Sequence, residues 1–410
     1  MKLLAISYAL PPMLYPQAIQ IGRLLSHSGL DVTAISAGEG EDAGQFGRRV
    51  KHHVVPFTNE PEGFLNSVAL RLVPFYGAMP DPFLAWTNSA YRAISEMVGK
   101  EGKPDLLVTF GEPMSDHLLG LRLQKELGVC WLAHFSDPWS DNPFRNIQPL
   151  SKLANRILER RVIEHADAIV FTSHETLDLV CRRYDASVHT RAAVLPHAFD
   201  PQAYPKQGAN DPSKPVILRY IGNFYGHRTP RPLIEALAWL SHNDPKALHD
   251  VHIELVGSVP SRMYSRGWKS LPPDLLVHRG GVSYAKSLEL MTTSDILLTI
   301  DAPARESVFF PSKLVDYIGA GRRLAGIVPP GAAARIIAEC GGSSVSPDAP
   351  AQAIASLLRD EIAAVRLERA SGFQRSPLPS SLNYEIARVA PVFDTMCRAV
   401  AAGESLGAVV

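Results

Sequence analysis

The chain has 410 residues, 46% of them hydrophobic, which is enough apolar material for the cores of two domains. Lysine and arginine together number 41, and so do aspartate and glutamate, so the formal net charge is zero. This balance excludes the global positive field of a nucleic-acid-binding protein, and any anion site must be local.

The four cysteines lie far apart, without the CxxC or CxxH spacings that indicate a zinc site or a disulfide framework. This usage favours a reducing, cytoplasmic setting. The opening "MKLLAISYALPP" is too short in its apolar part for a signal peptide or a membrane span, and it predicts a first strand. No later stretch reaches the roughly 18 uninterrupted apolar residues of a membrane helix.

Through residues 1–199, short runs that are apolar on both faces alternate with amphipathic helical stretches. This alternation predicts parallel strands in a first α/β domain. The strand-like runs cover residues 2–8, 31–37, 105–111, 129–135, 167–173 and 192–198.

Residues 200–215 are rich in proline, aspartate, glycine and serine, which indicates a linker between two domains. The alternation restarts over residues 216–380 and predicts a second α/β domain of similar size. Its strand-like runs cover residues 216–223, 251–257, 275–281, 295–301 and 323–329.

The last segment, 381–410, carries a helical pattern over residues 384–400 that Pro391 should kink. A lone amphipathic helix after a complete domain must bury its apolar face, and we expect it to pack on the first domain. The predicted fold is therefore two doubly wound, Rossmann-like α/β domains that face a central cleft. In such sheets ligands bind beyond the carboxyl ends of the strands.

A helical pattern follows the strand-like run 295–301 and starts with a proline, a serine and a lysine, in "PSKLVDYIGAG" (311–321). The free N–H groups and the positive dipole end of such a helix start suit a phosphate. Ser312 can add a hydroxyl and Lys313 a charge, while Asp316 can accept hydrogen bonds from a ribose diol. Alternatively, Ser312 is an N-cap, Lys313 is solvated and Asp316 pairs with an arginine.

A second loop, "YIGNFYGHRTP" (220–230), follows the first strand of the second domain. Gly222 leaves room for close backbone approach, and Arg228 leads into the next helix. Two phosphate-competent loops in one domain predict a diphosphate site, although an ordinary glycine-rich turn with an exposed arginine has the same sequence. The strand ends near Ser258 and Val282 either present backbone groups to a nucleobase or form simple turns.

Nearly the whole chain resembles the GT-B fold glycosyltransferases, in particular the retaining, nucleotide-sugar-dependent family 4 type. "PSKLVDYIGAGRRLAGI" (311–327) is similar to a "PSK…EY…AAG" variant found in bacterial polysaccharide transferases. The resemblance implies that the second domain holds a nucleoside diphosphate through Gly222, Arg228 and Lys313. It also implies that Asp316 binds the ribose.

This sequence departs from the family pattern at several positions. Many members carry two glutamates eight positions apart; here Asp316 replaces the second, and Val308 stands at the position of the first. Glu306, two residues earlier, is then the candidate for a contact to the donor sugar. Asn223 stands where an arginine usually follows the loop glycine, so the phosphate site has one charge fewer.

Two segments of the first domain, 110–121 and 131–144, also resemble the bacterial subgroup and lie at strand ends. Carboxylates beside an aromatic face suit the hydroxyl and apolar surfaces of an acceptor sugar. In this subgroup aspartate and arginine are common where this chain has His134 and Ser136, so the acceptor or the activity can differ. Trp139 could equally be a core residue and His117 a helix residue satisfied by the backbone. The candidate acceptor residues are His117, His134, Asp137 and Trp139.

The resemblance implies transfer of a sugar from a nucleotide diphosphate donor to a glycan or lipid-linked glycan hydroxyl, with neither a metal nor a further cofactor. Arg228, Lys313 and the helix start at Ser312 would stabilise the departing diphosphate. Two rival functions stay open. One is a sugar-nucleotide epimerase or a phosphorylase of the same fold, and the other is a non-catalytic homologue that binds a nucleotide sugar or glycan as a scaffold.

The stretch 150–167 predicts a basic amphipathic helix. Such a helix can lie on an anionic membrane, which would place the protein peripherally at the inner membrane face. A solvated basic face on an ordinary packed helix is the alternative. The basic positions are Lys152, Arg156 and Arg160, and the apolar positions are Leu153, Ile157 and Val162.

Overall fold

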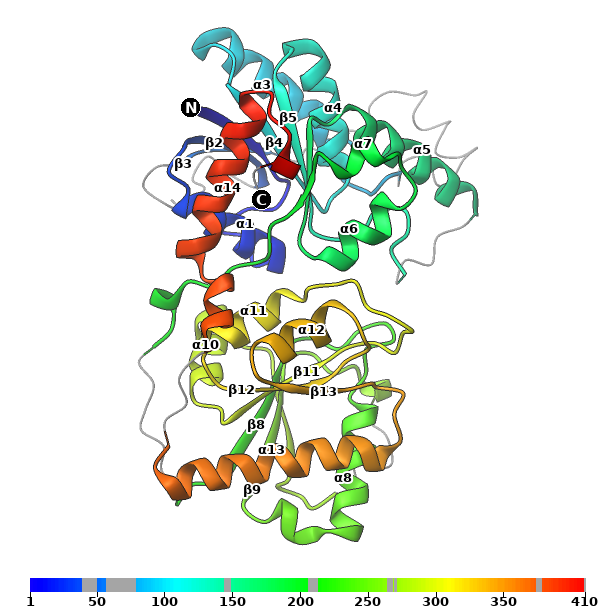
Figure 1. The fold of residues 1–410 in the computed structure, drawn as a ribbon, viewed down its shortest axis with the longest axis vertical. Coiled ribbons are helices and arrows are strands. Elements are labelled where there is room, and N and C mark those ends of the chain that lie inside the picture. The colour runs from blue at the N-terminus through cyan, green and yellow to red at the C-terminus, as the bar shows by residue number, and fades with distance from the viewer. Residues whose placement is uncertain are drawn as a thin grey trace. The chain divides into compact units, whose positions relative to one another are not determined.

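The computed structural model describes residues 1–38, 50–56, 79–143, 149–205, 213–263, 268, 271–373 and 378–408. The chain divides into two compact units (Figure 1). The first unit comprises residues 1–197 together with 386–410, and the second comprises residues 198–385.

The first unit is built on a seven-stranded parallel sheet with the strand order β3-β2-β1-β4-β5-β6-β7. Its strands are β1 (Lys2–Ile6), β2 (Asp31–Gly38), β3 (Val50–Pro56), β4 (Leu106–Gly111), β5 (Cys130–Phe135), β6 (Ala168–Phe171) and β7 (Ala192–Val194). Its helices are α1 (Pro16–His27), α3 (Trp86–Glu101), α4 (Ser115–Leu127), α5 (Pro149–His165), α6 (His174–Cys181), α7 (Ala186–His189) and α14 (Ile386–Ala401).

The sequence pattern predicts six of these seven strands and misses β3. Every residue of β4 and five of the six residues of β5 are buried, because helices cover both faces of the sheet centre. In β3, by contrast, only Val55 is buried, since the strand lies at the edge of the sheet. An edge strand with polar residues has no continuous apolar run to reveal it.

The second unit is built on a six-stranded parallel sheet with the strand order β10-β9-β8-β11-β12-β13. Its strands are β8 (Val216–Ile221), β9 (Val251–Val256), β10 (Leu276–Gly280), β11 (Ile296–Ile300), β12 (Arg323–Ile327) and β13 (Ser343–Val345). Its helices are α8 (Arg231–Asn243), α10 (Tyr284–Thr292), α11 (Ser312–Gly319), α12 (Ala332–Glu339) and α13 (Ala351–Ser371).

In both sheets the strand order reverses once, beside the first strand of the unit. β1 lies between β2 and β4, and β8 lies between β9 and β11. The loops that leave two neighbouring strands at such a switch point run in opposite directions and leave a crevice at the carboxyl ends of the strands. The doubly wound architecture predicted from the sequence is therefore confirmed, and it locates the edge of each sheet where a ligand fits.

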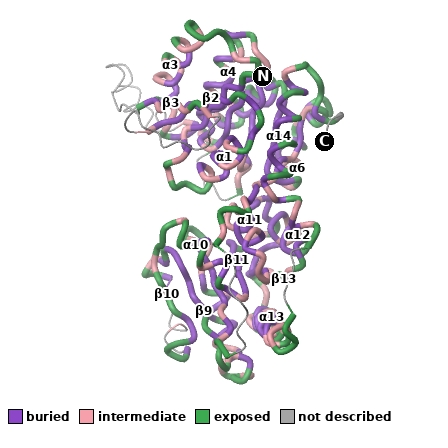
Figure 2. The backbone as a smooth tube through the Cα atoms, turned by 90° about the vertical axis from the view of Figure 1, so that its left-hand side faces the viewer, coloured by how far each residue is buried: buried purple, intermediate pink, exposed green. Residues whose placement is uncertain are grey.

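The C-terminal helix α14 returns to the first unit, as predicted, and packs against α1. Figure 2 shows α14 buried along much of its length, and its buried side chains include Phe393. Asp394 is 7% exposed and fixes the contact: it accepts hydrogen bonds from the Ser28 hydroxyl at 2.6 Å and from the Gly29 N–H at 2.7 Å. A Cβ atom on Gly29 would approach the same carboxylate to 3.0 Å.

Substitution Asp394→Ala should destabilise the first unit by about 2–3 kcal/mol, because it leaves a buried hydroxyl and a backbone N–H without their charged acceptor. Urea unfolding measures the effect. The exposed Glu404, in the same terminal segment, is the matched control: Glu404→Ala should change the free energy of unfolding very little. Equal effects of the two substitutions would show that the carboxylate does not secure α14.

Candidate functional site

The loops that follow β8, β9 and β10 are bound to one another at the carboxyl edge of the second sheet. The Asn223 side-chain oxygen accepts the Ser258 N–H at 2.8 Å, and the Gly257 N–H donates to Gly280 at 2.7 Å. Gly257 has φ = 121°, and a Cβ there would lie 2.3 Å from the Gly222 carbonyl oxygen. Only glycine fits that position, so the three loops form one continuous backbone surface.

Arg228 crosses the switch point of this sheet to meet the end of β11. Its Nε and Nη2 both donate to one oxygen of Asp301, at 3.1 and 2.7 Å. The Asp301 side chain is 1% exposed and also accepts the Ala302 N–H at 2.9 Å. The Tyr225 ring stacks on the guanidinium at 4.9 Å, and its hydroxyl accepts from Nη1 at 3.2 Å. Arg228 is thus held in place, unlike the exposed turn arginine of the alternative interpretation.

Lys313 lies in the first turn of α11, beside the same switch point. Its ammonium donates to the Tyr220 hydroxyl at 2.8 Å and lies 4.0 Å from the centre of that ring. A Cβ atom on Gly222 would lie 3.3 Å from the Lys313 nitrogen, so the loop after β8 and the start of α11 meet at the lysine. One turn further on, Tyr317 fastens the helix to β8: its hydroxyl accepts the Ile221 N–H at 2.7 Å and donates to the Ile221 carbonyl at 3.0 Å.

The two cations of this site differ in how firmly they hold their charge. Burial alone would lower the pKa of Arg228, but Asp301 and the two neighbouring tyrosines raise it above its ordinary value. Burial lowers the pKa of Lys313 well below its ordinary value, and repulsion by Arg228 lowers it further. The edge of the sheet therefore offers one firmly held charge and one ammonium whose charge burial disfavours and an approaching anion would stabilise.

Asp316 and Ser312 complete the part of α11 that the sequence singles out. Asp316 is 6% exposed; Tyr284 donates to its carboxylate at 3.1 Å, and Tyr204 donates to its backbone carbonyl at 2.9 Å. Pro311, rather than Ser312, occupies the N-cap position, so Ser312 is the first residue of the helix and has a partly exposed side chain. The alternative interpretation of Ser312 as an N-cap is therefore wrong.

The remaining sequence candidates of the second unit lie around this edge with more exposure. Glu306 is exposed, whereas Val308 is buried and only 7% exposed. Val282, 39% exposed, precedes Ser283, whose hydroxyl caps α10 by accepting the Lys286 N–H at 3.2 Å. Of these residues, Glu306 and Val282 have side chains that face solvent.

In the first unit, α4 begins with two buried ionisable residues. The Asp116 carboxylate accepts the Tyr8 N–H at 2.6 Å and so joins α4 to the loop after β1, across the switch point of the first sheet. Burial raises the pKa of Asp116 well above its ordinary value, against the effect of that hydrogen bond. His117 contacts the Thr109 hydroxyl through Nδ1 at 2.8 Å, and its Nε2 has no partner among the described residues. Burial, with a smaller effect of His134, lowers the pKa of His117 to about 3.

His134, in β5, is the second buried histidine at this edge. It is 5% exposed, and its ring lies 5.2 Å from that of Phe110 on β4. Burial lowers the pKa of His134 to about 4, although a backbone hydrogen bond acts in the opposite direction. Its Nδ1 and the hydroxyl of Ser136 are also without a hydrogen-bond partner in the described part of the chain. Two buried imidazoles that are neutral at neutral pH thus lie at the carboxyl edge of the first sheet.

The two remaining acceptor candidates, Asp137 and Trp139, differ in how far they are buried. Asp137 is partly exposed just beyond β5. Trp139 is fully buried, and its indole N–H donates to Asn155 on α5 at 2.7 Å. Its ring has no free face for a sugar, so Trp139 belongs to the core, as the alternative interpretation holds.

Sequence reasoning misses the residues that hold the site together, above all Asp301, Tyr317 and Asp116. Asp301 ends the apolar run 295–301, and Asp116 precedes the selected His117. An acidic residue directly after a buried strand of the switch point is the signal that would have found Asp301. No comparable signal marks Tyr317, because its role depends on which strand α11 packs against.

Neither a metal cluster nor a membrane span is found in the part of the chain that the structure describes. Within it, no group of three His, Cys, Asp or Glu side chains is placed to hold a metal ion. Among the described helices, none combines the length and the hydrophobicity that crossing a membrane requires.

Residues 16–198 match the family model described as "Glycosyl transferase 4-like domain". The whole chain is similar in structure to Anabaena Alr3699/HepE, solved with UDP and glucose: identity is 13%, the TM-score is 0.63, and 96% of this chain and 98% of that chain are covered. WaaG, a glycosyltransferase involved in lipopolysaccharide biosynthesis, is 16% identical with a TM-score of 0.60, covering 96% and 99%. A putative UDP-N-acetylglucosamine 2-epimerase from Listeria monocytogenes is 9% identical with a TM-score of 0.61, covering 97% and 96%. A comparison with curated proteins finds no match.

Residues 16–198 are therefore similar to a glycosyl transferase 4-like domain, and the fold of the chain is GT-B-like. The resemblance deduced from the sequence is confirmed at this level.

The lowered pKa of Lys313 predicts a pH dependence of stability. The unfolded lysine, with a pKa of about 10.4, binds a proton that the folded lysine has already released, so stability rises with pH between the two values, by at most about 1.4 kcal/mol per pH unit. Lys313→Met removes this rise. Urea unfolding of wild type and variant, from neutral to alkaline pH, should show the wild type gaining stability relative to the variant.

The exposed Lys286 of α10, which pairs with Glu289, provides the control. The difference between wild type and Lys286→Met should stay constant over the same pH range. If the difference between wild type and Lys313→Met is also constant, then the lysine titrates in the folded protein as it does in the unfolded chain, and the proposed desolvation is refuted.

Proposed function

We propose that the protein is a glycosyltransferase that takes a sugar from a nucleoside diphosphate donor held by the second unit. The observation that carries this proposal is the convergence of Arg228, Lys313 and Gly222 at the switch point of the second sheet. A fixed guanidinium, an amine and a side-chain-free backbone suit the two phosphate groups of such a donor. HepE, solved with UDP and glucose, has the same fold.

Catalysis would act on the departing diphosphate. Breaking the bond between the sugar and the phosphate places negative charge on the leaving oxygen, and Arg228 is preorganised to meet it. Lys313 would add a second positive charge, which the bound diphosphate would stabilise against the effect of burial. Removing one preorganised donor of this kind costs on the order of 100-fold in rate.

The other candidates of the second unit would surround the nucleoside and the sugar. Asp316 would bind the ribose by exchanging its hydrogen bond with Tyr284 for one from a ribose hydroxyl. Ser258 and Val282 would flank the base, and the exposed Glu306 would contact the donor sugar.

We also propose that the anomeric configuration is retained and that the reaction proceeds without a metal. At the carboxyl edge of the second sheet, Asp301 forms an ion pair with Arg228, and Asp316 accepts a hydrogen bond from Tyr284. Neither carboxylate is therefore placed as a general base. The leaving phosphate would then take the proton of the acceptor hydroxyl.

The acceptor would be a glycan or lipid-linked glycan that contacts the carboxyl edge of the first sheet. His117 and His134 are uncharged at neutral pH because their pKa values lie near 3 and 4. Both imidazoles and the Ser136 hydroxyl are buried, so they would support the acceptor surface from beneath, where their lack of charge avoids attracting an anion. Asp137, partly exposed beside them, would complete the acceptor site.

A non-catalytic homologue that serves as a scaffold is the second candidate, and a specific residue favours it. Val308 is buried and apolar at the position where many relatives carry an acid near the donor sugar. Nucleotide binding is common to both functions, so only turnover distinguishes the scaffold from the transferase. An epimerase requires acid and base groups around the sugar, and among the candidates described here only Glu306 is placed for such a role.

Calorimetric titration with UDP, GDP, ADP and dTDP tests the donor site. One nucleotide should bind, and Arg228→Ala and Lys313→Ala should each weaken it by about 1.5–3 kcal/mol, the contribution of a hydrogen bond to a charged group. Arg231→Ala is the matched control, because Arg231 lies three residues away and pairs on the surface with Glu235 at 2.6 Å. If no nucleotide binds, or if all three variants bind alike, the proposed site is wrong; if binding occurs without turnover of the matching sugars, the scaffold function is favoured.

The exposed face of α5 supports a membrane contact. Leu150, Leu153 and Ile157 are 83%, 56% and 49% exposed and follow one another at helical spacing. Lys152 and Arg160 are exposed on the same helix, whereas Val162 is buried in the core. Apolar side chains interleaved with cations fit an anionic lipid surface, and we propose that α5 attaches the protein peripherally to such a membrane.

Sedimentation with lipid vesicles tests this contact. The wild type should bind vesicles of phosphatidylcholine that contain phosphatidylglycerol, and Leu153→Ser with Ile157→Ser should weaken binding at least about tenfold through lost apolar burial. Leu367→Ser, at a residue of α13 that is 71% exposed, is the control and should bind like the wild type. Equal binding with and without the anionic lipid, or by all three proteins, would contradict the proposal.

A further inference from the structure

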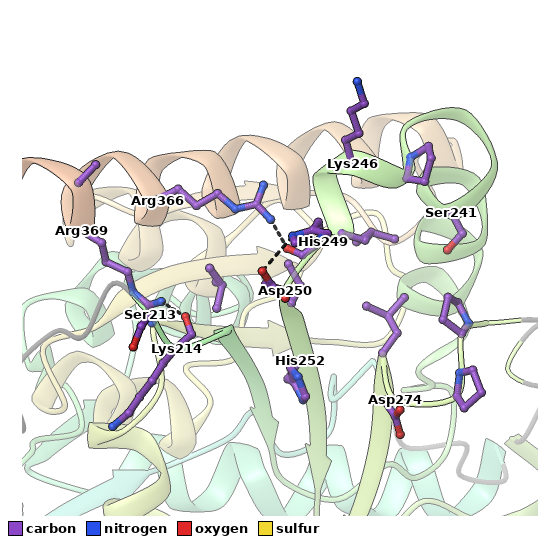
Figure 3. A pocket seen from close by; sticks show the side chains of 18 residues that line it. Ser213, Lys214, Ser241, Lys246, His249, Asp250, His252, Asp274, Arg366 and Arg369 are labelled. Atoms are coloured by element: carbon purple, nitrogen blue, oxygen red, sulfur yellow. Dashed lines mark hydrogen bonds and ion pairs between the residues drawn. The ribbon is translucent and has the colours of Figure 1, made fainter.

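The second unit has a cavity at the edge of its sheet opposite to the candidate nucleotide site. We call it the amino-edge cavity; it is lined by residues around 213–216, 245–252 and 272–275 and by Arg366 and Arg369 of α13 (Figure 3). Its volume is about 1010 Å³, which is ample for a drug-sized small molecule. The six residues of β8 separate the two sites by about 20 Å.

Arg366 brings an uncompensated charge to this cavity. Its Nη2 donates to the carbonyl oxygens of Ala247 at 3.2 Å and of His249 at 2.5 Å. Nε and Nη1 have no partner among the described residues, and no described carboxylate pairs with the guanidinium. Nη2, the nitrogen common to both two-pronged edges of the guanidinium, is thus used by neutral carbonyls, while Nε and Nη1 each keep N–H donors that can bind an oxyanion singly.

Arg369, one turn along α13, is bound more completely. Its guanidinium donates to the Asp295 carboxylate at 2.7 Å and to the backbone carbonyl of Pro215 at 3.3 Å, and its side chain is 10% exposed. Its Nε is buried without a partner among the described residues. Arg369 therefore fixes the wall of the cavity and leaves Arg366 as the group that can receive a ligand.

The remaining charges around the cavity also favour an anion. Its lining includes four lysines and arginines, of which Arg369 already pairs with Asp295, and two aspartates, of which Asp250 contacts His249 Nδ1 at 2.9 Å. Lys246 is exposed at the rim and points away from the cavity (Figure 3), so it contributes to the field and not to a direct contact. His252 and the hydroxyl of Ser241 add neutral polar groups to the lining.

The backbone at the rim is unusual as well. Asp250 has φ = 52°, and it is the one non-glycine residue with positive φ in the described part of the chain. Its carbonyl accepts the Val216 N–H at 2.8 Å, which closes the start of β9 on β8. Conformations of this kind cost free energy and cluster at ligand sites.

We propose that the amino-edge cavity is a second ligand site that binds a small molecule through a phosphate or carboxylate oxyanion, with Arg366 as its main contact. The site is independent of the nucleotide site, since it lies at the other edge of the sheet and shares no residue with it.

Calorimetry on a protein without the carboxyl-edge cations tests this proposal. In the background Arg228→Ala with Lys313→Ala, the probes are glucose 6-phosphate and, separately, citrate at low salt. At least one should bind, and the one that binds identifies the oxyanion as a phosphate or a carboxylate. Adding Arg366→Gln should weaken binding about tenfold or more, as expected for a lost charged hydrogen bond.

Arg359→Gln is the matched control, because Arg359 is on the same helix, 43% exposed and paired with its neighbour Asp360 at 3.1 Å. It should bind the probe like the background protein. The proposal is overturned if neither probe binds the background protein, or if Arg366→Gln and Arg359→Gln bind equally.

If Arg366→Gln does not fold, Lys246→Glu decides the question. Lys246 is exposed and has no partner among the described residues, so the fold should tolerate the reversal of its charge. At low salt the variant should bind the probe several-fold more weakly than the background protein. At high salt this difference should shrink, because screening removes the field of the rim. An unchanged affinity at low salt would refute the anion site.

Discussion

Every strand of both sheets runs parallel, and this arrangement decides where polar chemistry can be placed in the molecule. Parallel sheets are covered by helices on both faces, so their strands must be apolar almost throughout. Polar side chains are then excluded to the two edges, where strands become loops. The single reversal of strand order in each unit opens a crevice at the carboxyl edge. The candidate donor and acceptor residues lie near these positions because there the fold leaves room for them.

Both units secure their switch point with a buried carboxylate. In the second unit, Asp301 at the end of β11 holds Arg228 from the loop after β8. In the first unit, Asp116 at the start of α4 holds the Tyr8 N–H from the loop after β1. Both side chains are buried, Asp301 at 2% and Asp116 at 0% exposed, and each binds a group of the loop that it meets. The loops are thereby fixed without a regular hydrogen-bond ladder between them, and the candidate ligand-binding groups that they carry are held in place.

The two edges of the sheets offer different electrostatic environments. The second unit has two cations at its carboxyl edge, whereas the first has buried histidines that burial keeps neutral. This division suits the proposed donor, which has a diphosphate, and the proposed acceptor, which has hydroxyl groups. At the amino edge of the second sheet, Arg366 is anchored by carbonyls and not by a carboxylate, and for that reason it keeps a charge for a further anion.

The sequence alone determines the strand and helix alternation, the two-part organisation, the return of the last helix and the positions of Arg228 and Lys313. These follow from local patterns: apolar runs, loop composition and the residues at a helix start. The edge strands β3 and β13 escape such patterns because they bury few apolar side chains. Only the tertiary structure decides that Trp139 is in the core, that Tyr317 fastens α11 to β8 and that Asp301 faces Arg228. These contacts join residues far apart in the chain, and they depend on which strand each loop and helix meets, which periodicity does not encode.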